Sequence, residues 1–168
     1  MLKYTICFIK RNNKILMLNR NKAPNMGMWN GVGGKIEQNE SPSDGIIRET
    51  FEETGILLDK IIFAGNAVWK SNRGDSGMHI FIAELPDEAK LSTPCQVEEG
   101  ILDWKEIDWI LNPDNKGIVS NMKMYLPKIL EGNYILKHRF TYIDGVMTSY
   151  ETSNLTEEDI NRINLIHV

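Results

Sequence analysis

Cysteine is scarce in this sequence, which has only Cys7 and Cys95 among its 168 residues. Two cysteines cannot build the set of disulfides that staples small secreted proteins. Cys7 lies in an apolar run and is predicted to be a core residue, and neither cysteine has the neighbouring histidine and acid of a catalytic thiol. The sequence therefore argues against a disulfide scaffold and against a thiol enzyme.

Long apolar runs are missing as well. No run reaches the roughly 18 residues that a membrane-spanning helix requires. The chain begins with a strand-like pattern, Met1-Leu2-Lys3-Tyr4, in place of a secretory signal. We therefore expect no membrane partner and a cytoplasmic location.

Basic residues are not in excess, since Lys and Arg number 19 while Asp and Glu number 23, for a formal net charge of −4. Proteins that coat nucleic acid without sequence preference are usually strongly basic, so a nucleic-acid partner is disfavoured. A small anionic substrate stays possible, because it needs only local positive charge or a bound metal.

Length and composition predict one ordinary domain. The 168 residues are close to the roughly 150 of an average domain, and 42% hydrophobic with 25% charged residues is typical of a globular chain. Strand patterns mixed with two or three helical patterns predict an α/β or α+β fold. We assign residues 1–150 to this domain and residues 151–168 to a C-terminal extension that forms a short helix or a tail.

The apolar pattern divides the domain into strands, helices and loops. Strands are predicted at 4–9, 14–19, 61–70, 78–85, 102–104, 134–142 and 146–150. Helical spacing occurs at 107–111 and 118–130, and residues 156–159 resemble the start of a short helix. Residues 21–28 are predicted to form a loop and residues 86–99 to be irregular.

A helix over 42–54 has the clearest boundaries in the sequence. Ser41 is a favourable N-cap, Pro42 suits the first helical position, and Asp44 follows three residues after the cap. Gly55 is placed to end the helix in a left-handed turn. Local chemistry therefore predicts both ends of this helix.

Three carboxylates gather on one side of this helix. At 100° per residue, Glu49, Glu52 and Glu53 lie within about 100° of one another. Such a group repels itself, and one arginine, Arg48, cannot neutralise three charges. Either the face is simply a solvated acidic surface, or a hard cation such as Mg²⁺, which prefers carboxylate oxygens, binds there.

A glycine-rich segment before the helix favours the metal. Gly31, Gly33, Gly34 and Lys35 could bring backbone groups and one cation up to a phosphate-bearing ligand. Mg²⁺ commonly retains substrate phosphates among its ligands.

Residues 34–56 read GKIEQNESPSDGIIRETFEETGI. This segment resembles the Nudix box: Gly, five residues, Glu, seven residues, then Arg-Glu-hydrophobic-any-Glu-Glu-any-Gly-hydrophobic. The matching residues are Gly34, Glu40, Arg48, Glu49, Glu52, Glu53, Gly55 and Ile56. Thr50 departs from the pattern, where a more apolar residue is usual.

The resemblance implies the Nudix fold, a mixed β-sheet sandwiched between α-helices with a loop–helix–loop catalytic motif. It also implies a catalytic metal, Mg²⁺ or Mn²⁺. Glu52 and Glu53 would bind the metal, Glu49 would bind it or orient the attacking water, and Arg48 would hold the glutamates in place. Glu40 would act through the start of the helix or through a water molecule.

The resemblance assigns further roles outside the helix. The carbonyl of Gly33 would be an additional metal ligand, and Lys35 and Arg20 would contact phosphate. Glu99 matches an acidic residue that many members supply from a separate loop, and it would serve as metal ligand or general base. Glu49, Glu53 and Glu99 all remain candidates for the base.

The flanks of the box suggest the substrate. Residues 28–35, MWNGVGGK, resemble the stretch before the box in MutT-type members, which hydrolyse oxidised purine nucleoside triphosphates. There the Asn of Trp-Asn-Gly contacts the purine edge, so Asn30 is a candidate for reading the base. Asn121 falls near another base-reading position, although an ordinary surface asparagine is an equally good interpretation.

The resemblance therefore implies a nucleoside triphosphate pyrophosphohydrolase that acts on 8-oxo-dGTP or a similar damaged purine nucleotide. Alternative Nudix substrates are guanosine tetraphosphate, a dinucleoside polyphosphate, a nucleotide sugar or an RNA 5′ end. A nucleotide-binding regulator without catalysis is a third interpretation, which the complete set of glutamates disfavours. Fold alone does not decide among these functions.

Overall fold

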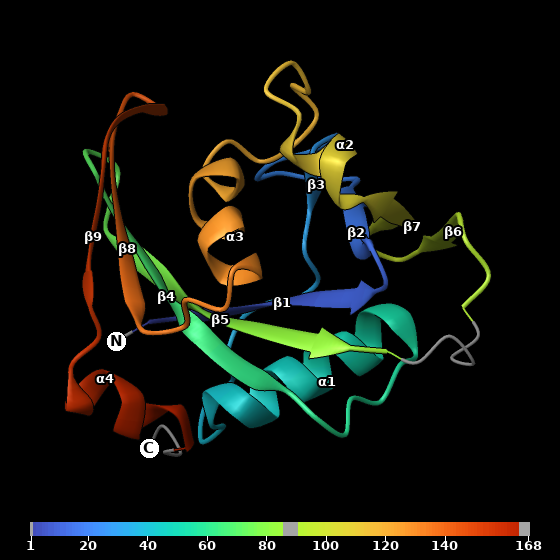
Figure 1. Ribbon diagram of the computed structural model, residues 1–168, viewed down its shortest axis with the longest axis horizontal. Helices are drawn as coiled ribbons and strands as arrows, with labels where there is room; N and C mark the ends of the chain where they lie inside the picture. The colour runs from blue at the N-terminus through green and yellow to red at the C-terminus, as the bar shows by residue number, and fades with distance from the viewer. Residues whose placement is uncertain (1, 86–90, 165–168) are drawn as a thin grey trace.

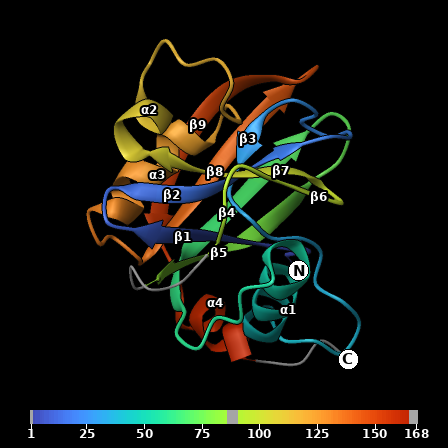
Figure 2. The same ribbon diagram turned by 90° about the vertical axis from the view of Figure 1, so that its right-hand side faces the viewer.

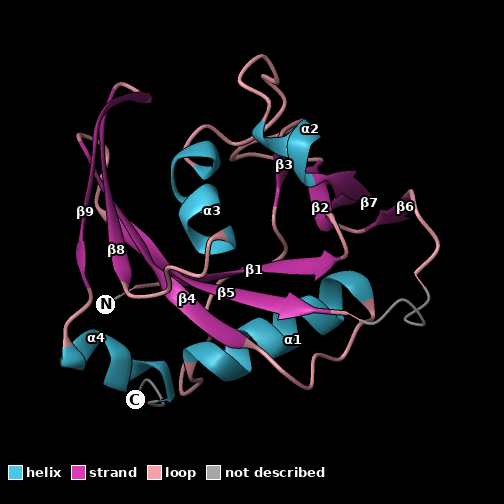
Figure 3. Cartoon of the chain, in the orientation of Figure 1, coloured by secondary structure: helices cyan, strands magenta, loops and turns pink. Residues whose placement is uncertain are grey.

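The computed structural model describes residues 2–85 and 91–164. Their strands are β1 (Tyr4–Arg11), β2 (Lys14–Arg20), β3 (Trp29–Asn30), β4 (Ile62–Ser71), β5 (Ser76–Glu84), β6 (Cys95–Val97), β7 (Gly100–Glu106), β8 (Leu136–Ile143) and β9 (Val146–Asn154). Their helices are α1 (Pro42–Thr54), α2 (Ile107–Leu111), α3 (Met122–Leu130), α4 (Glu157–Asn161) and the 3₁₀ turn η1 (Arg162–Asn164). Figures 1 and 3 show helices on both sides of the sheet.

One mixed sheet contains all the strands, in the order β6-β7-β2-β1-β5-β4-β8-β9, with β3 paired to β2. The pairs β1–β5 and β4–β8 are parallel, and the neighbouring pairs are antiparallel. The predicted mixed sheet between helices is thereby confirmed.

Strands β1 and β2 diverge from their shared turn. Their paired residues, Lys10 with Ile15 and Arg11 with Lys14, lie next to the turn. Farther along, the segment after β3 takes the place of β2 beside β1: the Thr5 N–H donates to the Gly34 carbonyl at 2.8 Å and the Cys7 N–H to the Val32 carbonyl at 2.7 Å. This divergence opens the sheet at one end and brings the glycine-rich segment into it.

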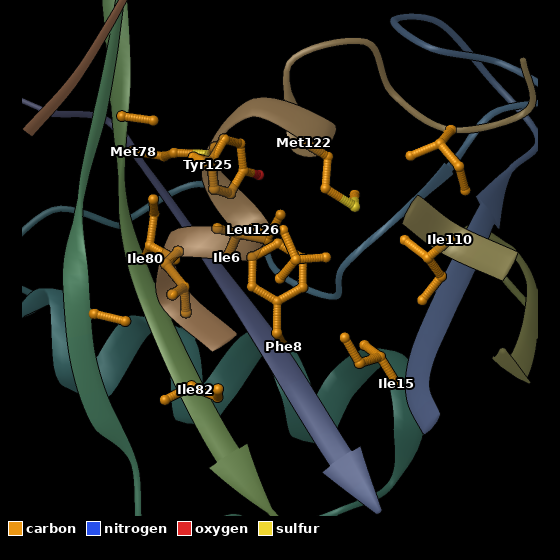
Figure 4. Packing of buried hydrophobic residues seen from close by; sticks show 14 of the residues in the cluster. Ile6, Phe8, Ile15, Met78, Ile80, Ile82, Ile110, Met122, Tyr125 and Leu126 are labelled. Atoms are coloured by element: carbon orange, nitrogen blue, oxygen red, sulfur yellow. The ribbon is translucent and has the colours of Figure 1, made fainter. Parts of the chain in front are cut away.

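Two apolar layers hold the helices to the sheet. Side chains from one face of β1, β2 and β5 pack against α2 and α3, where Tyr125 and Leu126 are fully buried. Figure 4 shows Ile6 and Phe8 from β1 close to these two residues. The opposite face packs against Ile46 of α1 and Ile163 of η1, and Figure 2 shows α1 and α3 on opposite sides. The fully buried Cys7 belongs to this second layer.

The predicted helix over 42–54 is confirmed as α1. The Ser41 side chain accepts a hydrogen bond from the Asp44 N–H, and Gly55 ends the helix with φ +74°. This left-handed conformation favours glycine because a Cβ would be strained there. Both ends of α1 are thus fixed by neighbouring residues.

Several predicted boundaries were wrong where distant pairing intervenes. Helix α3 begins at Met122, four residues after the predicted start, because Ile118 bridges to Trp29 and the Val119 N–H donates to the Trp29 carbonyl. Part of the segment predicted to be irregular forms β6 against β7, and residues 86–90 of it lie outside the described residues. Strand β9 continues through residue 150 to Asn154, and Thr156 caps α4.

No helix among residues 2–85 and 91–164 has the length and apolar character needed to cross a membrane.

Buried His138 makes stability depend on pH. Its side chain is fully buried on β8, and its Nδ1 lies 2.9 Å from the Tyr150 hydroxyl. Burial, with a smaller contribution from Lys128, lowers its pKa from 6.5 to about 4. The folded state then binds a proton less readily than the unfolded chain, so stability is lost as the pH falls from about 6.5 towards 4.

We therefore predict that His138→Gln reduces the loss of unfolding free energy between pH 7 and pH 4.5. A pKa difference of this size corresponds to roughly 3 kcal/mol at the acid end. Urea titrations at several pH values measure the effect. Parallel pH profiles for wild type and variant would contradict it.

Candidate functional site

A cavity of about 530 Å³ opens where β1 and β2 diverge. Its walls come from β1, the loop after β2, the glycine-rich segment, α1 and the turn between β6 and β7. Of the predicted site residues it contains Arg20, Asn30, Gly33, Lys35, Glu49, Glu53 and Glu99. The volume is in the range of small-molecule sites.

Glu53 is the most buried carboxylate of the cavity, at 5% exposure. Its Oε2 accepts a hydrogen bond from the Gly33 N–H at 3.0 Å. Burial raises its pKa to about 8; the hydrogen bond from Gly33 opposes this shift, the charges of Glu49 and Glu99 add to it, and Arg20 opposes it more weakly. The positive charge of Arg20 therefore compensates only part of the cost of burying this carboxylate.

Glu49 lies against the backbone of the glycine-rich segment. A Cβ built on Gly34 would come within 2.4 Å of the Glu49 Oε2, so a side chain at position 34 would displace this carboxylate. Gly33 is equally constrained, since its φ is +147° and a Cβ would lie 2.3 Å from the Thr5 carbonyl oxygen. Burial raises the pKa of Glu49 although Arg48 opposes the shift.

Arg48 uses every N–H group of its guanidinium. Its Nε and Nη2 donate to the two oxygens of Glu40 at 2.7 and 2.9 Å, a bidentate pair. Its Nη1 donates to Glu49 at 3.0 Å and to Glu52 at 3.1 Å, and Nη2 also donates to the Lys35 carbonyl at 3.1 Å. The guanidinium lowers the pKa of Glu40, so Arg48 joins the glycine-rich segment to α1.

Glu52 shares the Arg48 Nη1 group with Glu49 but lies outside the cavity. Its side chain is 56% exposed and turns towards Arg48, and it is outside the described lining of the cavity. Accordingly, no preformed cluster of three metal-ligating side chains occurs in the described parts of the chain. Arg48 neutralises part of the charge of the glutamates around it.

The donor set of the cavity fits a hard divalent cation. Glu49, Glu53 and Glu99 offer carboxylate oxygens, which Mg²⁺ and Mn²⁺ prefer. The raised pKa of Glu53 is also consistent with a cation site, because a bound cation would stabilise the ionised carboxylate that burial disfavours.

Three cationic side chains line the same cavity, namely Arg20, Lys22 and Lys35. The Arg20 Nε donates to the Pro24 carbonyl at 2.8 Å, which fixes its direction. Lys22 and Lys35 are exposed. A cavity lined by both cations and carboxylates suits a metal-bound ligand that carries phosphates.

Asn30 offers a hydrogen-bond donor to the cavity. Its own Oδ1 accepts from the Gly31 N–H at 2.9 Å, which leaves the Nδ2 group to bind a ligand. The neighbouring Trp29 is less available for stacking, because the Lys105 Nζ lies 4.5 Å from its ring centroid and Trp109 packs against it edge-on.

Asn121 is not brought to this cavity. It lies at the start of α3, near the Tyr142 hydroxyl. The described lining of the cavity does not include it. Its base-reading role therefore stays a prediction.

Some residues of the site were missed by sequence reasoning. Lys22 and Asn25 line the cavity from the loop predicted at 21–28. Asn21 contacts the turn that carries Glu99. The high content of polar residues in this loop was the available signal, but their direction depends on how the loop folds back.

Known proteins share this architecture. Residues 1–122 match the family model described as NUDIX domain. The chain is 30% identical over 149 residues to the uncharacterized Nudix hydrolase YvcI of Bacillus subtilis, covering 83% of this chain and 86% of that protein. It is 29% identical over 109 residues to the oxidized purine nucleoside triphosphate hydrolase of Mus musculus, covering 64% and 67% respectively.

Among solved structures, the mutator MutT protein from Bacillus halodurans has a similar fold, with a TM-score of 0.76 and 25% sequence identity. The alignment covers 91% of this chain and 98% of that one. The similarity extends well beyond the box, to most of the sheet and its helices.

Proposed function

The chain belongs to the Nudix family, and we propose that it is a Mg²⁺- or Mn²⁺-dependent hydrolase of guanine-type nucleoside triphosphates, 8-oxo-dGTP among them. The reaction adds water across the bond between the α- and β-phosphates and yields the nucleoside monophosphate and pyrophosphate. The observation that carries the proposal is one cavity that is lined by carboxylates, cations and an amide donor.

Glu49, Glu53 and Glu99 would hold the metal together with the Gly33 carbonyl, and Glu52 would join them by turning away from Arg48. When bound, the metal neutralises charge on the phosphate oxygens and orients water. The choice of these residues rests on their place in the cavity, on the Nudix resemblance and on the donor preferences of Mg²⁺.

The protein's own groups have separate tasks in this proposal. Arg20, Lys22 and Lys35 bind the phosphate chain and hold it in line for attack. A carboxylate of the cavity accepts the proton of the attacking water, with Glu49, Glu53 and Glu99 within the same space. Arg48 fixes the position of α1 relative to the glycine-rich segment, because it bonds to Glu49 on the helix and to the Lys35 carbonyl in the segment.

The base preference follows from the direction of the Asn30 amide. With Oδ1 bonded to the Gly31 N–H, the side chain presents a donor to the base. Guanine offers acceptors at O6 and N7, whereas adenine carries a donor at N6. Both purines have an acceptor at N7, so the Asn30 donor favours a 6-keto purine over adenine by contacting the 6-position, and 8-oxoguanine retains the O6 acceptor.

The relatives support the same class of substrate. The mouse protein is named for the hydrolysis of oxidized purine nucleoside triphosphates, and the Bacillus halodurans structure is that of a MutT protein.

The proposal is tested by kcat/KM for 8-oxo-dGTP, dGTP, dATP, guanosine tetraphosphate, ADP-ribose and diadenosine tetraphosphate. We expect the guanine triphosphates to exceed dATP by about tenfold or more, equivalent to about 1.4 kcal/mol of transition-state binding. A clear preference for ADP-ribose or for the dinucleotide would overturn the substrate assignment and leave the Nudix chemistry in place.

Changing the Asn30 donor to an acceptor is expected to alter this preference. Asn30→Asp keeps the contact with the Gly31 N–H but presents a carboxylate oxygen to the base. We predict that the ratio of kcat/KM for dGTP over dATP falls by about tenfold or more. The control is Asn154→Asp, which adds the same charge at an exposed position of β9, outside the cavity lining. It should leave the ratio of kcat/KM for dGTP over dATP unchanged. An unchanged ratio in Asn30→Asp would remove this residue from base recognition.

A further inference from the structure

We infer that Asn21 is a positioning residue, which holds the carboxylate of Glu99 in the cavity by binding both carbonyls of the β6–β7 turn. The inference rests on the proposed function, in which Glu99 is a metal ligand or the base. It assigns a task to a loop residue outside the Nudix box.

The contacts of Asn21 go directly to the two residues of that turn. Its Nδ2 donates to the Glu98 carbonyl at 2.9 Å, and its backbone N–H donates to the Glu99 carbonyl at 3.0 Å. The turn itself is short, because Val97 pairs with Gly100 and only Glu98 and Glu99 lie between them. One side chain and one backbone group thus fix both peptide carbonyls of the turn.

The opposite side of the turn is also pressed against β2. Gly100 has φ +151°, and a Cβ there would lie 1.8 Å from the Asn19 carbonyl oxygen. Glycine is therefore required for the turn to approach the end of β2 this closely. The adjacent Glu99 enters the cavity near enough to Glu53 to raise the pKa of that carboxylate.

The two strands that flank this turn are held to different extents in the described residues. Strand β6 has three residues and is the last strand of the sheet, paired to β7. Strand β7 pairs with β2 up to Gly100, whereas the β6 side has few backbone bonds to secure it and opens more readily. The Asn21 side chain supplies a bond from outside the hairpin and so limits the positions that Glu99 can reach.

The end of β2 offers a matched comparison. The Asn19 side chain donates from Nδ2 to the Gly27 carbonyl at 3.1 Å, on the other loop beside the cavity. Asn19 and Asn21 are therefore the same residue type, two positions apart, with one side-chain bond to a loop carbonyl each. Only the bond of Asn21 reaches the turn with Glu99.

The test compares four variants with wild type. Three are single variants, namely Asn21→Ala, Asn21→Leu and Glu99→Gln, and the fourth is the double variant Asn21→Ala/Glu99→Gln. Leucine approximates the shape of asparagine without a donor, and both variants keep the backbone N–H. The readouts are kcat with the best nucleotide of the substrate panel, the Kd for Mn²⁺ of the substrate-free protein by electron paramagnetic resonance, and amide hydrogen exchange of residues 97–101.

We expect the Asn21 variants to lower kcat and weaken Mn²⁺ binding by about tenfold, as losses of outer-shell contacts do, with faster exchange in the turn. In the Glu99→Gln background, the same change should alter kcat by less than about twofold. Asn19→Ala should instead combine additively with Glu99→Gln.

The outcomes separate the inference from the proposed function. If Glu99→Gln lowers kcat and the Asn21 variants match wild type, Asn21 does not position Glu99 while the proposed function stands. If the Asn21 effect is fully additive with Glu99→Gln, Asn21 acts through something else and the inference fails. A Glu99→Gln variant with wild-type kcat would remove Glu99 from the proposed mechanism and, with it, the role of Asn21.

Discussion

Replacing Glu53 with glutamine is expected to lower kcat by about a hundredfold or more while the fold persists. Glutamine has almost the same shape and can still accept the hydrogen bond from the Gly33 N–H. It cannot carry the negative charge that a divalent cation requires. The loss should therefore appear in metal binding and turnover rather than in structure.

Without metal, Glu53→Gln should be more stable than wild type, although its turnover is lower. The folded pKa of Glu53, about 8, is above the ordinary value of 4.5, so the folded protein retains a proton that the unfolded chain has released. Wild type then loses stability as the pH rises through this window. Glu53→Gln removes that loss, and its Tm in EDTA at pH 8 should exceed the wild-type Tm.

Thermal unfolding at pH 5.5 and pH 8, together with kcat in Mg²⁺, measures both effects. The control is Glu131→Gln, which neutralises an exposed carboxylate at the end of α3 and should change neither. Turnover of Glu53→Gln near the wild-type rate would contradict the assignment of Glu53 to the metal site.

Replacing Arg48 with lysine is expected to lower kcat by roughly ten- to a hundredfold and to destabilise the fold by about 2 kcal/mol. Lysine keeps the charge but loses the planar fork, which binds Glu40 bidentately and reaches Glu49, Glu52 and the Lys35 carbonyl. Glu49 would then lose the contact that directs it towards Gly34.

Urea unfolding and steady-state kinetics measure this prediction. Arg73→Lys, in the exposed turn between β4 and β5, serves as the matched control and should behave as wild type. If Arg48→Lys had wild-type kcat and stability, the bidentate contact with Glu40 would not organise the site.

The boundaries of α1 could be predicted from sequence because their causes are local. Ser41 bonds to the N–H of Asp44 three residues later, and Gly55 adopts the left-handed conformation that ends a helix. The start of α3 could not, because residues just before it bridge to Trp29, almost 90 positions away. Local signals therefore predict a helix end that is capped by neighbouring residues, as in α1. They do not predict one that is set by pairing with a distant segment, as in α3.

The sequence could predict which residues belong to the candidate site, but not which of them face the cavity. Helical geometry placed Glu49, Glu52 and Glu53 on one side of α1, but it could not show which of them face the gap between β1 and β2. That depends on how α1 packs beneath the sheet, and the structure directs Glu49 and Glu53 into the cavity and Glu52 towards Arg48. The contact of Asn21 with the β6–β7 turn joins segments more than 70 residues apart and has no local signature.

The central claim is metal-dependent hydrolysis between the α- and β-phosphates of a guanine-type nucleoside triphosphate. The most direct measurement is product identification by ³¹P NMR after incubation with 8-oxo-dGTP and dGTP, in Mg²⁺ and in EDTA. The account predicts nucleoside monophosphate and pyrophosphate in Mg²⁺ and no turnover in EDTA. Release of orthophosphate and a nucleoside diphosphate, or no turnover of either nucleotide in Mg²⁺, would contradict it.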